Sequence, residues 1–328
     1  MPDQLIYAME VTLNGLMAGV LYALVALGFV LIFKASGIFN YAQGVMALFA
    51  AMTLVGIMNG QVPFSHLINA IFGTHIHYFG WQVPALLAIL LTVVVMVILA
   101  WMVQQFIMRH LVGQEPIILF MATIGLAYLL EGVADLMWGS EIKTLDVGLP
   151  QGINLWIDET TYGIFGYGFF IDNLDIVATI IAALLVAGLV AFAQFTKQGR
   201  AMRAVADDHQ AALSVGISLN FIWVLVWSVA GFVALVAGIM WGTKSGVQFS
   251  LSLIALKALP VLMLGGFTSI PGAIVGGLII GVGEKLFEFA LGPALGGATE
   301  NWFAYVLALI FLVFRPQGLF GEKIIERV

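Results

Sequence analysis

The chain has 328 residues, of which 62% are hydrophobic and only 9% are charged, with a formal net charge of −6. Soluble domains usually carry about 25% charged residues, and the mean hydropathy here is +1.08. This composition excludes an ordinary soluble domain and predicts a chain that lies mostly in lipid. The sequence contains no cysteine, which excludes disulfides, thiolate metal sites and cysteine nucleophiles.

Apolar segments divide the sequence into membrane spans. The first ten residues are acidic, and the apolar run after them is longer than the core of a signal peptide, so we expect this run to be the first span. A span needs roughly 20 apolar residues. The clear candidates are 12–33, 44–59, 84–108, 117–139, 175–196, 221–242 and 301–314.

One further apolar stretch, 253–290, is too long for one helix and is broken in the middle. It predicts either two crossings or one re-entrant pair. We favour two crossings, which bring the total to nine rather than eight. No linker or charge block divides the chain. We therefore predict a single all-α transmembrane domain, 1–328, with about 8–9 transmembrane helices.

The charged residues predict the orientation. Basic residues gather in the loops of one side and at the end of the chain, which the positive-inside rule assigns to the cytoplasm. The basic set is Lys34, Arg109, Lys197, Arg200, Arg203, Arg315, Lys323 and Arg327. The opposite loop, about 140–174, is mainly acidic. We expect the N-terminus outside and the C-terminus inside.

Small and amide residues mark the first span and its end. Gly15 and Gly19 are four residues apart, a spacing that lets another helix approach closely in lipid. Asn40 and Gln43 lie at the break before the second span, where hydrocarbon would leave their amides unsatisfied. We expect these amides either to cap the turn or to line a substrate pathway. Asn14 is a further pathway candidate.

The stretch 196–220 predicts a short amphipathic helix on the cytoplasmic side. An apolar stripe at helical spacing indicates it, and Gly216 would end it. The stripe comprises Met202, Val205, His209, Ala212 and Val215. Such a helix is either a solvated surface element or is shaped to dock into a groove of a partner protein.

Glycines surround the break in 253–290. Gly265 and Gly266 precede it, and we expect Pro271 to force it. Interrupted helices in transporters often border the translocation route, so these three residues are candidate pathway residues. Glycines spaced by four across 272–281 predict tight helix packing. Lys257 opens the stretch and is either a functional group within the membrane or a snorkelling residue.

Several chemistries lack their motifs. No G-x-x-x-x-G-K-[ST] phosphate loop occurs, so we expect the energy of ATP to arrive through a partner. His75 and His77 lie beside Tyr78 and Trp81 without a nearby carboxylate, which favours aromatic anchoring at the membrane surface over a metal site. We expect no cofactor, no metal, no catalytic residues and no nucleic-acid partner.

Three sequence blocks resemble the permease subunits of branched-chain amino acid ABC transporters. The blocks are NGLMAGVLYALVALGFVLIFKASGIFNYAQG, GRAMRAVADDHQAALSVGI and LKALPVLMLGGFTSIPGAIVGGLIIG. The resemblance extends over nearly the whole chain, although the segment 60–83 is longer than expected for the family. It implies a bacterial or archaeal inner-membrane protein that works beside a second homologous permease, two cytoplasmic ATPase subunits and a periplasmic binding protein.

In that family the cytoplasmic loop between spans contacts the ATPases. Carried over to this sequence, the resemblance implies a set of coupling residues within 196–220. The set is Gly199, Arg200, Arg203, Ala204, Asp207, Ala211 and Gly216.

Other transport functions stay open. The substrate could be urea, a short amide or another amino acid, and a related sugar-type ABC permease would share the broad architecture, although the block 14–44 favours amino acids. An ion-coupled secondary transporter would need carboxylates at mid-span. Glu131 and Asp135 instead lie near a span end, where they either reach water or form an acidic lining for a substrate ammonium group.

Overall fold

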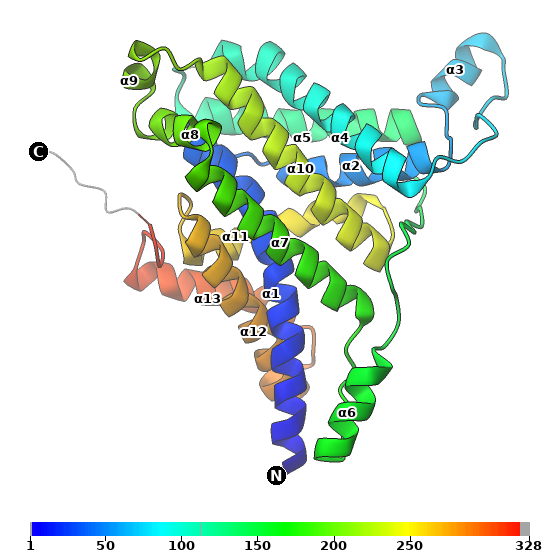
Figure 1. The fold of residues 1–328 in the computed structure, drawn as a ribbon, viewed down its shortest axis with the longest axis vertical. Coiled ribbons are helices and arrows are strands. Elements are labelled where there is room, and N and C mark those ends of the chain that lie inside the picture. Colours follow the sequence, from blue (N-terminus) through cyan, green and yellow to red (C-terminus); the bar gives the residue numbers. More distant parts are fainter. Residues whose placement is uncertain (1, 112, 322–328) are drawn as a thin grey trace, which may run out of the picture. The chain divides into compact units, whose positions relative to one another are not determined.

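The computed structural model describes residues 2–111 and 113–321, which fold as an all-α protein (Figure 1). Lys323 and Arg327, two of the predicted cytoplasmic basic residues, lie outside the described part. The α-helices are α1 (Pro2–Ser36), α2 (Gln43–Met58), α3 (Ser65–Phe72), α4 (Ala85–Met102), α5 (Pro116–Trp138), α6 (Leu155–Phe165), α7 (Asn173–Phe195), α8 (Lys197–Asp207), α9 (His209–Ser214), α10 (Leu219–Ser245), α11 (Ile254–Gly265), α12 (Ile270–Leu295) and α13 (Glu300–Phe314). Short π and 3-10 turns extend α4 to Leu111 and precede α11.

The chain divides into two compact units, each assembled from separate stretches of sequence. Unit 1 contains Met1–Val30, Leu149–Gly188 and Leu256–Val328, and unit 2 contains Leu31–Gly148 and Leu189–Ala255. The long helices α1 and α7 each begin in unit 1 and end in unit 2. That residues 1–328 act as a single permease domain stays a prediction.

The apolar segments predicted from the sequence are helices. Five helices of the described chain have the length and composition of a membrane span, and α11 with α12 forms a further pair bent by 114°. The shorter helices α2 and α13 are also apolar. Nine crossings would require that both of these shorter helices and both arms of the bent pair cross the membrane as well.

Glycines bring α1 and α12 into contact within unit 1, as their spacing predicts. A Cβ on Gly19 would lie 2.6 Å from the carbonyl oxygen of Gly277, and one on Gly15 would lie 2.8 Å from the Cα of Val282. Gly281 meets the backbone of Gly15 from the opposite side. Real Cβ atoms do not approach backbone this closely, so only glycine permits this helix separation.

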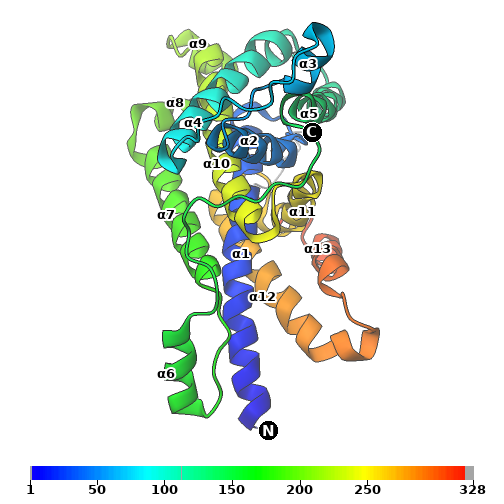
Figure 2. The same cartoon turned by 90° about the vertical axis from the view of Figure 1, so that its right-hand side faces the viewer.

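Unit 2 is built around α2, which packs against α4, α5 and α10 (Figure 2). The described side chains of α2 are buried from Gln43 to Gly56. A Cβ on Gly238 of α10 would lie 2.5 Å from the carbonyl oxygen of Ala47, so close helix approach through glycine recurs here. Because α2 is enclosed by protein, apolar composition is expected around its whole circumference.

The apolar stretch 253–290 is interrupted as predicted, but the cause of the break differs from the prediction. The helical pattern stops after Gly265, and α12 resumes with Ser269 as its N-cap, whose hydroxyl accepts a hydrogen bond from the Gly272 amide at 3.0 Å. Pro271 occupies the first turn of α12, where a missing N–H removes no helical bond. Pro271 therefore follows the break rather than forcing it.

Candidate functional site

The segment 196–220, which we call the coupling segment, contains two short helices rather than the single helix predicted. Thr196 caps α8, and its hydroxyl accepts a hydrogen bond from the Gly199 amide at 2.9 Å. Asp208 is extended, with φ −156°, and its carboxylate caps α9 by accepting from two amides. An aspartate that bonds the next helix's amides competes with helix continuation, which explains the break.

The apolar stripe extends across the break at Asp208. Met202, Val205 and Ala212, three residues of the predicted apolar stripe, are buried within this chain. Val215, by contrast, is 74% exposed, so the first part of the predicted stripe packs inside this chain and its last residue faces outward. The side chain of His209 lies outside the described residues. Gly216 ends the segment's helical part in the left-handed region, with φ +84°, as expected for a helix stop.

Helix α8 is fastened to the last turn of α7. The Arg203 Nη1 donates a hydrogen bond to the carbonyl oxygen of Ala193 at 2.6 Å. Gly199 lies against the same turn, where an added Cβ would lie 2.6 Å from the Cα of Ala193. Gly199 is therefore a close-packing position, and Arg203 satisfies a carbonyl that the end of α7 leaves free.

The predicted coupling residues fall on two faces. Gly199 is buried, and Arg203 and Ala204 are half-buried, so these three face the protein. Four are exposed, namely Arg200, Asp207, Ala211 and Gly216. The exposed face also carries two large apolar side chains, Leu213 and Val215. The exposed side of the coupling segment thus combines apolar and charged side chains.

The end of the coupling segment is linked to α4. The side-chain nitrogen of Gln104 donates to the side-chain oxygen of Asn220, in the first turn of α10, at 3.4 Å. Gln104 is 1% exposed and lies in a π-helical turn, a distortion that occurs often at functional positions. The coupling segment is thus attached to unit 2 both where it begins and where it ends.

Asn40 and Gln43 are buried and form hydrogen bonds within unit 2. The side-chain oxygen Oδ1 of Asn40 accepts from the main-chain amide of Ala42 at 3.1 Å, and the side-chain nitrogen Nδ2 donates to the side-chain oxygen of Gln43 at 3.3 Å. The side-chain nitrogen Nε2 of Gln43 donates to the main-chain carbonyl oxygen of Ala230 at 3.2 Å. Of the two roles that the sequence left open, this geometry supports capping of the turn before α2.

The remaining pathway candidates lie in unit 1 at two different levels. Asn14 is half-buried on α1, next to Gly15, which meets α12 at Gly281. Gly265 instead packs against Gly272 at the break, nine residues earlier on α12, or about 14 Å along a helix. Gly266 is buried with φ +102°, and Pro271 is exposed. The structure therefore does not bring Asn14 together with the break.

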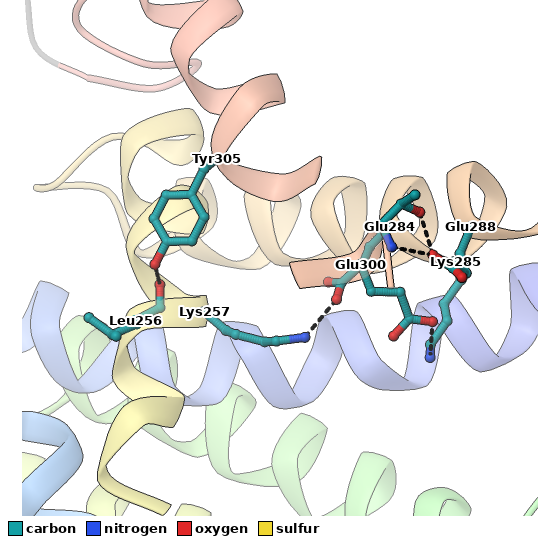
Figure 3. A network of polar contacts seen from close by, with 8 residues as sticks. Leu256, Lys257, Glu284, Lys285, Glu288, Glu300 and Tyr305 are labelled. Atoms are coloured by element: carbon teal, nitrogen blue, oxygen red, sulfur yellow. Dashed lines mark hydrogen bonds and ion pairs between the residues drawn. The ribbon is translucent and has the colours of Figure 1, made fainter. Parts of the chain in front are cut away.

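A partly buried ion pair joins the two arms of the bent pair (Figure 3). The Nζ of Lys257 on α11 lies 2.7 Å from a carboxylate oxygen of Glu284 on α12. The Glu284 side chain is 1% exposed and that of Lys257 is 34% exposed. Lys257 also lies over the Tyr22 ring, 5.7 Å from its centroid, within the range of a cation–π contact. Both charges are thus compensated inside an apolar part of the chain.

Three further contacts tie α13 to the bent pair (Figure 3). Lys285 pairs with Glu300 at 2.8 Å. The carboxylate of Glu288 accepts hydrogen bonds from the amide and the hydroxyl of Thr299, which precedes α13. The hydroxyl of Tyr305 donates to the carbonyl oxygen of Leu256 at 2.7 Å. Sequence reasoning singled out only Lys257 here, although charged residues within the apolar run 270–295 were a usable signal.

The comparisons with known proteins decide the family. The family "Branched-chain amino acid transport system / permease component" matches residues 11–315. The chain belongs to this permease family. The relatives of this permease include the high-affinity branched-chain amino acid transport system permease protein LivH of Escherichia coli (strain K12), with 27% identity over the full length of both chains. The corresponding protein BraD of Pseudomonas aeruginosa is 28% identical, also over the full length of both.

An archaeal relative extends the comparison. The probable branched-chain amino acid transport permease protein LivH of Methanocaldococcus jannaschii is 27% identical over 92% of this permease and 89% of its own length. The recognised family, the helical fold and the apolar spans together make this chain a multi-pass membrane permease component.

Proposed function

We propose that this chain is the membrane-spanning permease subunit of an ATP-driven importer that carries branched-chain or similar amino acids across the inner membrane. Membership of the permease family and the full-length likeness to permeases named for branched-chain amino acids support this function. The absence of a phosphate-loop motif in the sequence is consistent with ATP hydrolysis in a separate partner chain. The partners are a second permease, two cytoplasmic ATPases and a periplasmic binding protein.

The coupling segment receives the movement of the ATPases in this proposal. The observation that carries it is the pairing of an exposed, partly apolar face with a firm attachment to α7 through Arg203 and Gly199. Closure of the ATPases on nucleotide would press on the exposed face. The attachment would then pass the displacement into α7, and alternating access would follow from the tilt of the spans.

The orientation follows from the proposed partners. The coupling segment and the C-terminus face the cytoplasm, and the N-terminus and the loop 140–174 face outward, where the binding protein delivers its substrate. The acidic loop suits a partner with basic rim residues. Asn14, Gly265, Gly266 and Pro271 are proposed to border the route, with Asn40 and Gln43 holding the turn before α2.

The docking role is tested in the assembled transporter. Arg203→Ala removes the bond to α7, and Gly216→Ala places a side chain at a positive φ. We expect both variants to lose most of the ATP hydrolysis that loaded binding protein stimulates in the reconstituted complex. Wild-type stimulation with an intact assembly would contradict the docking role.

The substrate is tested through the binding protein and uptake. Calorimetry with the purified binding protein should give tight binding of leucine, isoleucine or valine. Proteoliposomes that contain all subunits should accumulate the same amino acid only when ATP is present on the side of the membrane that carries the ATPases. Uptake by this chain alone, driven by an ion gradient, would instead establish a secondary transporter and overturn the proposal.

A further inference from the structure

The segment between α2 and α4, residues 60–83, folds into a defined element that we call the aromatic platform. It contains α3 and the loop that follows, and it lies at the edge of unit 2 (Figure 1). Phe72 is 74% exposed and Trp81 is 66% exposed. The other large apolar side chains exposed on the platform are Leu67, Ile71, Ile76, Tyr78 and Phe79. Apolar exposure this dense on a folded segment indicates a binding surface.

The platform is closed at its base. The Val83 amide donates to the carbonyl oxygen of Met58 at 3.0 Å, and the Phe79 amide donates to that of Gly60 at 2.8 Å. Gly60 has φ +61° and lies directly against the carbonyl of Trp81. These bonds hold the entering and leaving chains side by side, so the platform keeps a fixed shape.

Asn69 fixes the loop against the polar side of α3. Its side-chain oxygen accepts from the Ile76 amide at 3.0 Å and from the Thr74 hydroxyl at 2.7 Å, and its nitrogen donates to the Ile76 carbonyl at 3.1 Å. Leu67 and Ile71 are four residues apart and lie on the other side of the helix from Asn69. One asparagine thus satisfies the loop's backbone while the apolar side chains stay uncovered.

The platform lies where two spans end. The side chain of Gln61 donates to the carbonyl oxygen of Trp138 at 2.9 Å, and the Phe64 amide donates to that of Met137 at 3.0 Å. Both acceptors lie in the last residues of α5, and the span that contains α4 begins at Ala85, directly after the platform. The platform therefore lies beside the ends of these two candidate spans.

The platform carries no formal charge. Residues 60–83 include no aspartate, glutamate, lysine or arginine, and tyrosine and tryptophan favour the boundary between lipid headgroups and acyl chains. We propose that the platform is embedded in the outer boundary of the bilayer, with its exposed aromatic and aliphatic side chains among the lipids. A short amphipathic helix with bulky apolar residues binds membranes in this way.

Lipid fits this surface better than a soluble partner does. Protein docking surfaces surround their apolar centre with a polar rim that includes charged groups, and the platform has no aspartate, glutamate, lysine or arginine to supply them, only three histidines that are formally neutral at pH 7. The platform leads directly into α4, whose first leucines, Leu86 and Leu87, are exposed, and this continuity with a candidate span favours lipid as its surroundings. An embedded platform would hold the ends of these two spans at a fixed depth while other helices move.

The absence of cysteine from the sequence makes the test direct. Single-cysteine variants Phe72→Cys and Ile76→Cys are spin-labelled and reconstituted with all partner subunits in phosphatidylcholine vesicles. Thr144→Cys, exposed in the loop after α5, is the matched control. Electron paramagnetic resonance then compares accessibility to oxygen, which is enriched in lipid, with accessibility to a water-soluble nickel chelate.

We expect the labels at positions 72 and 76 to be more accessible to oxygen than to nickel, and the label at 144 to show the reverse. Greater accessibility to nickel at 72 and 76 would overturn the proposal. Protection from both reagents that disappears when the binding protein is omitted would also overturn it, since a protein would then cover the surface.

A second measurement does not depend on labelling. Brominated lipids quench tryptophan fluorescence at short range, and Trp81→Phe removes one of the eight tryptophans while keeping an aromatic ring. The quenched fraction should be smaller in Trp81→Phe than in the wild type. An unchanged or larger quenched fraction would contradict an embedded platform.

Discussion

The guanidinium of Arg203 donates a hydrogen bond to the main-chain carbonyl of Ala193 at 2.6 Å, which joins α8 to the last turn of α7. The last carbonyls of a helix have no partner within the helix, and they attract a cation through the helix dipole. Arg203 therefore gains a charge-assisted bond and fixes the angle between the two helices. A loop helix held in this way can transmit a displacement that a loosely tethered one would absorb.

Gly199→Ala tests whether this junction carries the coupling. The added Cβ would lie 2.6 Å from both the Cα and the carbonyl oxygen of Ala193, so α8 must move away from α7. We expect about 1–3 kcal/mol of destabilisation and a marked loss of ATP hydrolysis stimulated by loaded binding protein. Stability is measured by thermal unfolding in detergent and coupling by the ATPase assay of the assembled transporter.

Gly188→Ala is the matched control on α7, since an added Cβ there meets nothing within 4 Å. It should leave stability and stimulated ATP hydrolysis close to the wild type. If Gly199→Ala behaves like Gly188→Ala, the junction is not needed for coupling.

Gly19→Ala should separate α1 from α12. Its Cβ would lie 2.6 Å from the Gly277 carbonyl oxygen, and backbone cannot rotate aside as a side chain can. We expect about 1–3 kcal/mol of destabilisation, measured as a lower midpoint of thermal unfolding in detergent. Gly125→Ala on α5, where an added Cβ has open space, should have little effect. Equal midpoints for both variants would rule out the close packing of the two helices.

The close-packing glycine faces of α1 and α12 were predictable because their cause is local. Spacings of four between small residues show from the sequence which helix faces permit close approach, and the apolar lengths gave the helices themselves. The sequence did not say which pair of glycine faces would meet. That depends on the packing of the whole unit.

Other features depended on competing interactions. Asp208 lies in a stretch with helical spacing, yet its carboxylate accepts hydrogen bonds from the amides of Gln210 and Ala211 and starts a second helix, so the single helix predicted for this segment is two helices. Likewise Lys257 was ambiguous in the sequence because its partner, Glu284, is 27 residues away. Long-range pairs of this kind follow from the tertiary arrangement and have no periodic signal.

The Lys257–Glu284 pair should show strong energetic coupling. Glu284→Gln leaves the lysine without its counter-ion, and Lys257→Met leaves a buried carboxylate unpaired. Removing one partner of a fully buried pair is worth about 3–5 kcal/mol, and the partial exposure of Lys257 reduces the expected loss to about 1–3 kcal/mol. The double variant Lys257→Met/Glu284→Gln should lose less than the sum of the two single losses.

Thermal unfolding of the four proteins gives the double-mutant cycle. The Lys285–Glu300 pair on the neighbouring turn supplies the comparison, since both of its side chains are about one-third exposed and its coupling should be smaller. Strictly additive losses for Lys257 and Glu284 would contradict an energetically important pair.

Lys143 should make stability depend on alkaline pH. It lies in the loop after α5, where its Nζ donates to the Gln61 side chain at 2.7 Å and to the Trp138 carbonyl at 2.5 Å. Burial lowers its pKa from the ordinary 10.5, and the nearby Glu141 opposes this only in part. Between the lowered pKa and 10.5 the unfolded chain binds more protons than the folded chain, so the free energy of unfolding rises with pH. At lower pH the lysine is charged in both states and its contribution is constant.

Lys143→Met removes the titrating group, so the wild type should gain stability relative to this variant as pH rises toward 10.5 in detergent. A stability difference that stays constant or changes in the opposite direction over this range would show that burial does not disfavour the charged form of Lys143.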